Sequence, residues 1–461
     1  MRREPDADPI RDLRAVVDRA IQEHVPPAAA MLVALSGGRD SVALFDALVA
    51  TAAAARRPLT AAHVHHGLSP NAELWAGFCT GLCAAHQVPL DVCRVDIARL
   101  PQRSLEASAR AARYAALSTA AAKHGIAYVL LAHHRDDQAE TVLLQLLRGA
   151  GPRGLAAMPP VARDAAGVTW LRPLLDVTRD TIDRYAEAAG LRFVDDESNS
   201  VLAHRRNAVR HQVMPALAAV FPRPGQTLAR AARMQADAAR LADDLAVIDA
   251  GEPAADGSLD RLQLAALPLH RAANVLRWLL RQHGLPAPSS ARLDAMLRQM
   301  RHARDDARIR IVHAGRAVGV HRGRVFVHAL PPALYALSWF GEAEVRLPHG
   351  RMTLVPQTGH GIDLAHVASA PLRIVSRRGG ERMRIGIDRP RQALKTLLQE
   401  AGIPVWRREA LPLVFCGATL AWVPGIGVAT GYATPPAGSG LAIAWHPDDE
   451  AAPGTVPDAI G

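Results

Sequence analysis

The sequence has few cysteines, few aromatic residues and no long hydrophobic run. Its four cysteines are too sparse in 461 residues for a disulfide framework. Aromatic residues make up 4% of the chain, which leaves little material for extensive base stacking. No run can span a bilayer, and no apolar signal core follows Met1. We therefore expect a cytoplasmic protein that is not attached to a membrane.

Lysine is also nearly absent, although the chain is strongly basic. Lys123 and Lys395 are the only lysines among 54 Lys and Arg residues, and the formal net charge is +10. Such a balance favours a polyanionic partner, with nucleic acid ahead of membrane. Arginine suits this partner because its planar fork binds phosphate and stacks on bases.

Strands and helices alternate over about the first 220 residues. We expect strands over 30–35, 59–64, 90–97 and 127–132, and helices over 40–54, 71–86, 104–124 and 136–148. This rhythm predicts an α/β fold with a doubly wound parallel sheet, which binds ligands at the carboxyl ends of its strands.

The remaining chain is organised differently. We expect a long helix over 226–248, helices over 259–304, a short hairpin over 308–327, and a strand-rich segment from 343 with one helix over 391–401. The predicted domains are a catalytic domain (1–222), a helical central domain (223–335), a smaller α+β C-terminal domain (336–446) and a loose tail (447–461).

A glycine loop follows the first predicted strand and reads Ser36-Gly37-Gly38-Arg39-Asp40-Ser41. Glycines allow close backbone approach to an anion, and N–H groups at a helix start point toward it. Asp40 suits a divalent cation that bridges phosphates. The loop lacks the Gly-Lys-Ser/Thr ending of a Walker A site, which disfavours a γ-phosphate kinase. The structural alternative is an ordinary tight turn.

A pair of acids follows the fourth predicted strand. Asp137 and Glu140 lie three residues apart on the first helical turn, so they share a face. Acids at a helix start also serve as caps, and Asp136 is the better cap candidate. In the functional interpretation, the pair binds magnesium or an ammonium group at the sheet edge that carries the glycine loop.

The glycine loop resembles the pyrophosphatase loop of the N-type ATP pyrophosphatases, which have an adenine nucleotide α-hydrolase-like sheet. This resemblance implies that ATP is a substrate, with Mg²⁺ as cofactor, and that Ser36 to Ser41 grip its pyrophosphate portion. The loop alone leaves the acceptor open, because the group includes GMP, asparagine and NAD synthetases, tRNA thiolases and tRNA(Ile)-lysidine synthases.

Further blocks resemble the tRNA(Ile)-lysidine synthases specifically. They lie at 62–69, 104–114, 133–141, 146–155, 172–175, 196–199, 206–215 and 394–408. This chain departs from the family pattern at His65, where Asn is usual, at Val201, where an acid is frequent, and near His204, where an aromatic is usual.

The resemblance implies ligation of lysine to C2 of the wobble cytidine in a CAU-anticodon isoleucine tRNA. ATP would adenylate the base with release of pyrophosphate, and lysine would then displace AMP, which changes the codon and amino-acid specificity from Met to Ile. Asp40, Asp137 and Glu140 would be catalytic, with Asp137 and Glu140 holding lysine and Asp40 holding magnesium. His63 would join the loop in binding ATP. The implied tRNA or phosphate contacts are Arg110, Arg113, Arg206, Arg210, Arg377, Arg378, Lys395 and Arg407.

Two basic groups and one cysteine pair bear on the alternatives. Residues 371–410 hold ten Arg and Lys against four acids, and Arg205, Arg206, Arg210 and His211 form a second group. These surfaces would bind RNA phosphates in a salt-dependent manner, or they are solvated cationic faces. A tRNA thiolase would depend on Cys79 or Cys83, which otherwise are buried hydrophobes one helical turn apart, and with His86 they are candidate metal ligands. A non-catalytic tRNA-binding protein is the third hypothesis, and a homodimer is left open.

Overall fold

The structure is a computed structural model in which the chain forms two compact units, divided between Asp244 and Leu245. It describes residues 8–67, 69–95, 105–164, 166–195, 205–251, 254, 257–302, 309–386 and 389–448. The family block at 196–199, Val201, His204 and most of the predicted tail lie outside these residues. The domain limits therefore stay predictions.

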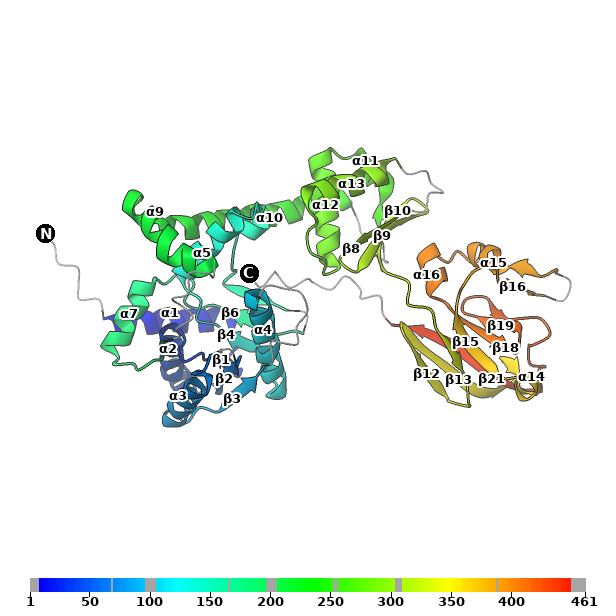
Figure 1. Cartoon of the computed structure of the whole chain (residues 1–461), viewed down its shortest axis with the longest axis horizontal. Helices are drawn as coiled ribbons and strands as arrows, with labels where there is room; N and C mark the ends of the chain where they lie inside the picture. The colour runs from blue at the N-terminus through cyan, green and yellow to red at the C-terminus, as the bar shows by residue number, and fades with distance from the viewer. Residues whose placement is uncertain are drawn as a thin grey trace. The chain divides into compact units, whose positions relative to one another are not determined.

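A six-stranded sheet forms the centre of the first unit (Figure 1). Its order is β3 (Leu90–Arg94), β2 (Leu59–His65), β1 (Met31–Ala34), β4 (Tyr128–Leu130), β6 (Thr169–Leu171) and β5 (Val161–Arg163). Met31 lies opposite Leu59 on one side and Tyr128 on the other, both in parallel pairings. The edge strand β5 runs antiparallel to β6. The predicted doubly wound sheet is confirmed.

Helices cover both faces of this sheet because successive side chains of a strand point to opposite faces. Met31 and Val33 belong to the core beneath α1 (Pro9–His24), α2 (Arg39–Ala55), α3 (Ala72–Ala85) and α7 (Arg179–Ala188). Leu32 belongs to the opposite core, beneath α4 (Leu105–Lys123). Figure 1 shows α2 and α3 on one side of the strands and α4 on the other.

The carboxyl ends of the strands lead into the elements that matter for function. β1 leads into α2, and β4 leads into α5 (Arg135–Leu146). The unit continues through α6 (Pro152–Leu155), α8 (Arg205–Ala208), the π-helical turn η3 (Val209–Val213), α9 (Met214–Val220) and α10 (Pro224–Ala250), which extends past the unit boundary.

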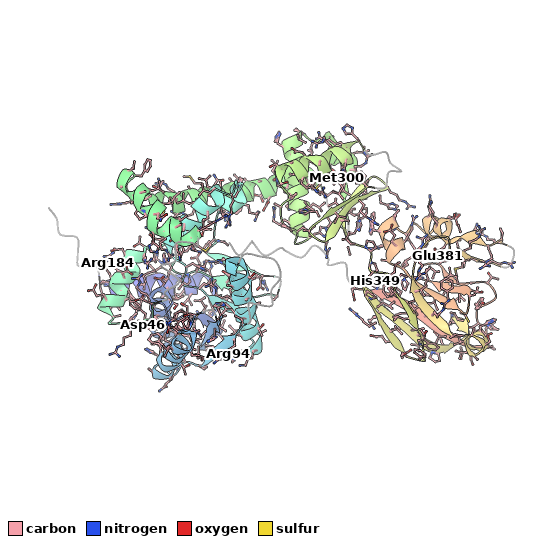
Figure 2. All side chains as sticks on the ribbon, viewed as in Figure 1. Asp46, Arg94, Arg184, Met300, His349 and Glu381 are labelled. Carbon is pink, nitrogen blue, oxygen red and sulfur yellow. The ribbon has the colours of Figure 1, made fainter. Side chains whose placement is uncertain are left out.

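A partly buried polar contact joins α1, α2 and α7. The hydroxyl of the fully buried Tyr185 donates to Asp46, which is labelled in Figure 2. Arg14 Nη2 donates to the same carboxylate at 3.0 Å, and Arg14 Nε donates to the tyrosine oxygen at 3.3 Å. The contact fixes three helices that were spaced far apart in sequence. Helix α1 was not predicted from the sequence; Asp8 caps its start by accepting from Ile10 N at 3.0 Å.

The second unit begins with a helical part that carries a small antiparallel sheet. Its helices are α11 (Arg261–Ala266), α12 (Leu269–Gln282) and α13 (Ser290–Arg301). The sheet has the order β7 (Leu259–Asp260), β10 (Arg324–Ala329), β9 (Arg316–His321) and β8 (Arg310–His313). The expected hairpin over 308–327 is therefore wrong in its strand number, because β8 also pairs with β9.

The C-terminal part of this unit packs two antiparallel sheets around a shared core. One has the order β11 (Ala336–Ser338), β15 (Leu372–Ser376), β18 (Pro412–Cys416), β19 (Thr419–Val423) and β20 (Gly427–Val428). The other has the order β12 (Glu344–Leu347), β13 (Gly350–Thr358), β21 (Ser439–Pro447) and β14 (Ile362–Asp363). A small pair, β16 (Arg382–Met383) and β17 (Gln392–Ala393), completes the strands.

Three short helices occur in this part within the described ranges 336–386 and 389–448, where the sequence predicted one over 391–401. They are α14 (Leu364–Ser369), α15 (Leu394–Glu400) and α16 (Val405–Ala410). Helices of six or seven residues show little periodicity, which explains why two were missed.

Candidate active site

The glycine loop turns sharply between β1 and α2. Gly37 has a φ of +88°, and a Cβ built on it would lie 2.9 Å from Val194 Cγ2 and 3.3 Å from Cys79 Sγ. Val194 N also donates to Gly37 O at 3.0 Å. Any other L-residue at this position would be strained by both conformation and space. The loop is therefore held in one shape by the segment that follows α7.

The two serines of the loop have different tasks. Ser41 is buried, and its hydroxyl donates to Gly38 O at 2.8 Å. Its oxygen accepts from Ser36 N at 3.2 Å and lies 2.9 Å from Ser36 Oγ, a contact in which either hydroxyl can donate. Ser36 is exposed. Ser41 thus shapes the loop, whereas Ser36 and the backbone N–H groups are available to an anion.

Arg39 is directed toward α7. Its Nη1 lies 2.7 Å from Asp183 Oδ1, and its Cζ lies 5.8 Å from the centre of the Phe193 ring. The sequence places Arg39 among the ATP-binding residues, and this remains a prediction. In the structure its guanidinium links the loop to α7 and to the segment after it.

Asp40 offers an oxygen that a cation could use. Its Oδ1 is buried and has no hydrogen-bond partner among the described residues, and lies 3.8 Å from Arg39 Nε. Its Oδ2 lies 3.5 Å from His134 Nε2. Within the described ranges, no three His, Cys, Asp or Glu side chains are grouped to hold a metal. A cation at Asp40 would thus have at most two such side-chain ligands from these residues.

His63 stands at the base of the loop and is 3% exposed. Its Nδ1 lies 2.9 Å from Leu35 O, so this nitrogen carries the proton and Nε2 is the free acceptor. Burial lowers the pKa of His63, which keeps the ring neutral. The sequence did not indicate this tautomer, because it depends on a carbonyl 28 residues away.

The cysteine pair has a structural explanation. Cys79 and Cys83 are buried in the core between α3 and the sheet. Burial raises the pKa of the Cys79 thiol to about 12 and that of the Cys83 thiol to about 11. A sulfur carrier needs an accessible thiolate. The thiolase alternative is therefore not favoured, and the reading of these residues as packed hydrophobes is supported.

The acid pair lies at the start of α5, at the same sheet edge. The helix begins at Arg135 with His134 as its N-cap residue, and Asp137 Oδ2 accepts from His134 N at 3.1 Å as part of a capping box. The interpretation of Asp136 as the cap of this helix is wrong. Asp136 Oδ2 instead accepts from Arg179 N at 2.9 Å, at the start of α7.

Two arginines from α8 and η3 close around the acid pair. Arg206 Nε lies 2.8 Å from Glu140 Oε2, and its Nη2 lies 3.0 Å from Asp137 Oδ1. Arg210 Nε lies 2.6 Å from Glu140 Oε1, and its Nη2 lies 3.0 Å from Asp137 Oδ1. Four predicted site residues therefore meet in one cluster. The sequence assigned the two acids to lysine and the two arginines to phosphate, and it did not anticipate this pairing.

His134 joins the acid pair to the glycine loop and was missed as a site residue. It is 1% exposed, and its Nε2 lies 3.5 Å from both Asp40 Oδ2 and Asp137 Oδ2. Burial alone would lower the pKa of His134, but the nearby Asp137 and Asp40 raise it more, so the net shift is upward. Likewise, burial raises the pKa of Asp137, but His134 and Arg206 lower it more. The pair Asp137 and His134 is thus stabilised in its charged form.

Further cations lie beside this cluster. Arg113 is half-buried and has no hydrogen-bond or ion-pair partner among the described residues, and burial lowers the pKa of its guanidinium. Arg110 Nη2 and Arg172 Nη2 each lie 3.4 Å from Tyr114 Oη. Arg172 is 2% exposed, and its signal in the sequence was the block at 172–175. These arginines can attract an anion to the cationic edge beside the acid pair.

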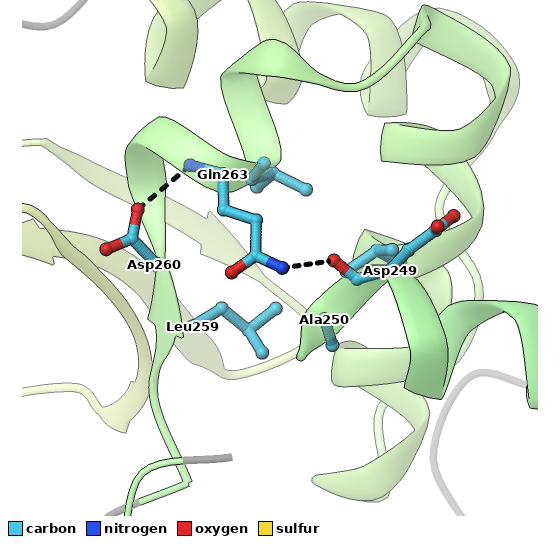
Figure 3. A pocket seen from close by; sticks show the side chains of 7 residues that line it. Asp249, Ala250, Leu259, Asp260 and Gln263 are labelled. Carbon is cyan, nitrogen blue, oxygen red and sulfur yellow. Dashed lines mark hydrogen bonds between the residues drawn. The ribbon is translucent and has the colours of Figure 1, made fainter. Parts of the chain in front are cut away.

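The remaining predicted RNA contacts lie in the second unit. Arg377 Nε lies 3.4 Å from Glu381 Oε2, which lowers its availability. Arg378, Lys395 and Arg407 are exposed. A shallow hollow in this unit, lined by Asp249, Ala250, Leu259, Asp260, Gln263, Leu264 and Val275, carries no comparable chemistry (Figure 3). Gln263 spans it, with Nε2 donating to Asp249 O at 3.0 Å and the backbone N–H donating to Asp260 Oδ1 at 2.9 Å.

The parallel sheet and its glycine loop are typical of the ATP-using PP-loop proteins. Residues 12–217 match the family model described as the PP-loop domain. Residues 259–326 match the TilS substrate binding domain, and residues 372–445 match the TilS substrate C-terminal domain. Among the described helices, none has the length and apolar character that crossing a membrane requires.

Relatives extend the match over nearly the whole chain. A tRNA(Ile)-lysidine synthase of Nitrosomonas europaea is 40% identical over 93% of this chain and 94% of its own. One of Burkholderia pseudomallei is 42% identical over 95% of this chain and 96% of its own. A solved TilS C-terminal domain aligns with 25% of this chain and 98% of its own, at 25% identity and a TM-score of 0.22. The chain belongs to the tRNA(Ile)-lysidine synthase family.

Proposed function

We propose that this chain ligates lysine to C2 of the wobble cytidine in a CAU-anticodon isoleucine tRNA, with cleavage of ATP to AMP and pyrophosphate. The observation that carries the proposal is that one buried histidine joins the two half-sites. His134 Nε2 lies 3.5 Å from Asp40 on the nucleotide loop and 3.5 Å from Asp137 of the acid pair. The reaction needs such adjacent sites because the activated base must meet both ATP and the amine. The enzyme would work in the cytoplasm.

In the first step, the cytosine C2 oxygen attacks the α-phosphorus of ATP, and the bond to pyrophosphate breaks. The loop contributes by positioning and by charge stabilisation. Ser36 and the N–H groups at the start of α2 would hold the pyrophosphate, and Ser41 keeps the loop in shape through Gly38 O at 2.8 Å. His63 would support the loop through Leu35 O at 2.9 Å.

The residues present fit a magnesium ion that is bound mainly by the nucleotide. Asp40 Oδ1 is buried without a hydrogen-bond partner among the described residues. Mg²⁺ is commonly held by one or two carboxylates together with phosphates and water. When bound, the ion would neutralise phosphate charge.

In the second step, the amine of lysine, once deprotonated, forms a bond from its nitrogen to C2. The C2–O bond breaks, AMP leaves with the oxygen, and the proton lost from the nitrogen passes to water. Asp137 and Glu140 would grip the lysine through its ammonium group. Arg113, with its guanidinium unpartnered among the described residues, would hold a phosphate of AMP or of the tRNA. Arg110, Arg206 and Arg210 would add to this cationic edge.

The second unit would bind the body of the tRNA through its exposed arginine and lysine side chains. Arg378, Lys395 and Arg407 are exposed there, and Arg377 lies beside them in sequence. Contacts of this kind bind phosphate without reading sequence, so they would give strong salt dependence. A base extruded into the catalytic site needs few aromatic residues.

One assay tests the proposal. The full-length protein is incubated with ATP, Mg²⁺, labelled lysine and a CAU-anticodon isoleucine tRNA transcript, and both pyrophosphate and tRNA-bound label are measured. We expect equal amounts of both, and neither with a tRNA whose wobble base is not cytidine. Label that stays off the tRNA while ATP is consumed would overturn the lysine assignment. RNA binding without ATP consumption would instead support a non-catalytic RNA-binding protein.

A further inference from the structure

The carboxylate oxygens of the acid pair are all engaged. Asp137 Oδ1 accepts from Arg206 Nη2 and Arg210 Nη2, each at 3.0 Å, and its Oδ2 accepts from His134 N at 3.1 Å. Glu140 Oε1 accepts from Arg210 Nε at 2.6 Å, and Oε2 accepts from Arg206 Nε at 2.8 Å and Arg210 Nη2 at 3.1 Å. The two guanidinium charges alone balance the two carboxylates, and His134 adds a further cationic partner to Asp137.

A substrate ammonium group cannot share this arrangement. Glu140 is 2% exposed, so a substrate ammonium group would have to enter a buried cluster in which both carboxylates already have cationic partners. Displacing the arginines without a new partner would leave buried charges uncompensated, which is strongly unfavourable. The acid pair, as it stands in the structure, is closed to lysine.

The two arginines are placed where another ligand can reach them. Their side chains are 24% and 21% exposed, whereas that of Glu140 is 2% exposed. Arg210 lies on η3, and single π-helical turns occur frequently at functional sites. Arginine forks bind phosphate bidentately, so a phosphate competes directly with the carboxylates for these groups.

A phosphate would find additional cations at this edge. Arg113 is close enough to Arg206 for their charges to interact, and it has no hydrogen-bond or ion-pair partner among the described residues. Arg210 also interacts electrostatically with Asp40, which places it within range of the nucleotide loop. A phosphate bound between the two half-sites would therefore act on the same arginines that cover the acid pair.

We propose that Arg206 and Arg210 close the amine site of the free enzyme, and that a bound phosphate group opens it by drawing them off Asp137 and Glu140. This inference rests on the proposed function, because it takes lysine as the amine. The phosphate belongs to the nucleotide or to the polynucleotide, which offer the same chemistry. The gate imposes an order in which the phosphate ligand binds first and lysine binds second.

Equilibrium dialysis of labelled lysine against the full-length protein tests the gate without any substitution. The arms are the protein alone, with α,β-methylene-ATP and Mg²⁺, with CAU-anticodon isoleucine tRNA, and with both. We expect the nucleotide analogue, the tRNA or both together to increase lysine affinity roughly tenfold or more over that of the free protein. The arm that shows the increase identifies the source. Equal lysine affinity in all arms overturns the gate.

Two variants with the same charge change sharpen the test. Arg210→Gln removes the fork that contacts both acids, so lysine should bind the free protein more tightly than it binds the unmodified protein. Arg184→Gln is the matched control, because Arg184 on α7 pairs with Asp180 at 3.0 Å and is labelled in Figure 2. It should leave lysine affinity unchanged. If Arg210→Gln does not fold, as judged by its unfolding transition, the dialysis series on the unmodified protein still decides.

The outcomes separate the gate from the proposed function. Lysine incorporation into tRNA together with equally tight lysine binding to the free protein overturns the gate alone. Absence of lysine binding in every arm and of incorporation overturns both. Incorporation with phosphate-dependent lysine binding supports both.

Discussion

Gly37→Ala is the most informative single change, because two independent penalties meet at this position. Gly37 has a φ of +88°, and an added Cβ would lie 2.9 Å from Val194 Cγ2. The left-handed conformation costs an alanine roughly 1–2 kcal/mol. The short contact adds about 1–2 kcal/mol, as in other overpacked sites. We therefore expect the free energy of unfolding of the first unit to fall by about 2–4 kcal/mol.

The matched control is Gly81→Ala on α3. A Cβ there meets no atom within 4 Å, and a helical glycine replaced by alanine should gain roughly 0.5–1 kcal/mol. Thermal unfolding would show the difference, because in a unit of this size about 1 kcal/mol corresponds to roughly 2–4 °C. The loop variant should also lose pyrophosphate release by on the order of 100-fold, since the nucleotide would be misplaced.

A double variant separates the two penalties. Gly37→Ala combined with Val194→Ala removes the short contact and leaves the backbone strain, so only part of the activity should return. Full recovery would show that conformation at Gly37 contributes nothing. Equal behaviour of Gly37→Ala and Gly81→Ala, in stability and in pyrophosphate release, would refute the reasoning altogether.

Three further predictions follow from the described contacts. Tyr185→Phe removes the hydroxyl bound to Asp46 and should cost about 1–3 kcal/mol in chemical denaturation, with lysine incorporation retained. Cys79→Ala should retain lysine incorporation, and the unmodified thiol should react slowly with alkylating reagents at pH 8, because burial raises its pKa to about 12. His134 and Arg206 hold the pKa of Asp137 below its ordinary value against the effect of burial. Its charge therefore adds stability that is present above about pH 4 and lost as the pH falls further, so Asp137→Asn should flatten the acid limb of a stability-against-pH curve.

The features that sequence could predict are local ones. Short apolar runs that end in glycine, as at residues 30–38, carry their meaning in neighbouring positions, and β1, the loop and α2 appear where expected. The positions of Asp137 and Glu140 on one face of α5 follow from helical spacing alone. The acids and the loop share a sheet edge because parallel strands place their carboxyl ends together.

The features that sequence could not predict depend on contacts between distant residues. Arg206 contacts Glu140, which lies 66 positions away in the sequence. No local pattern distinguishes an arginine that pairs with buried acids from one that is exposed for RNA binding. Asp136 shows the same limit, because its partner is the first N–H of a helix 43 residues away. His134 was overlooked because its importance lies in two carboxylates that converge on one ring nitrogen.

The choice of guanidinium groups around the acid pair has a consequence for side reactions. An activated cytidine is open to any amine, and a lysine side chain in the site would compete with the substrate. Guanidinium groups stay protonated throughout the working pH range, so Arg113, Arg206 and Arg210 are poor nucleophiles. The lysine of the first unit, Lys123, lies near the amino end of β3 and pairs with Asp91 at 2.8 Å. In the proposed reaction, these guanidinium groups would therefore protect the protein against covalent capture by its own intermediate.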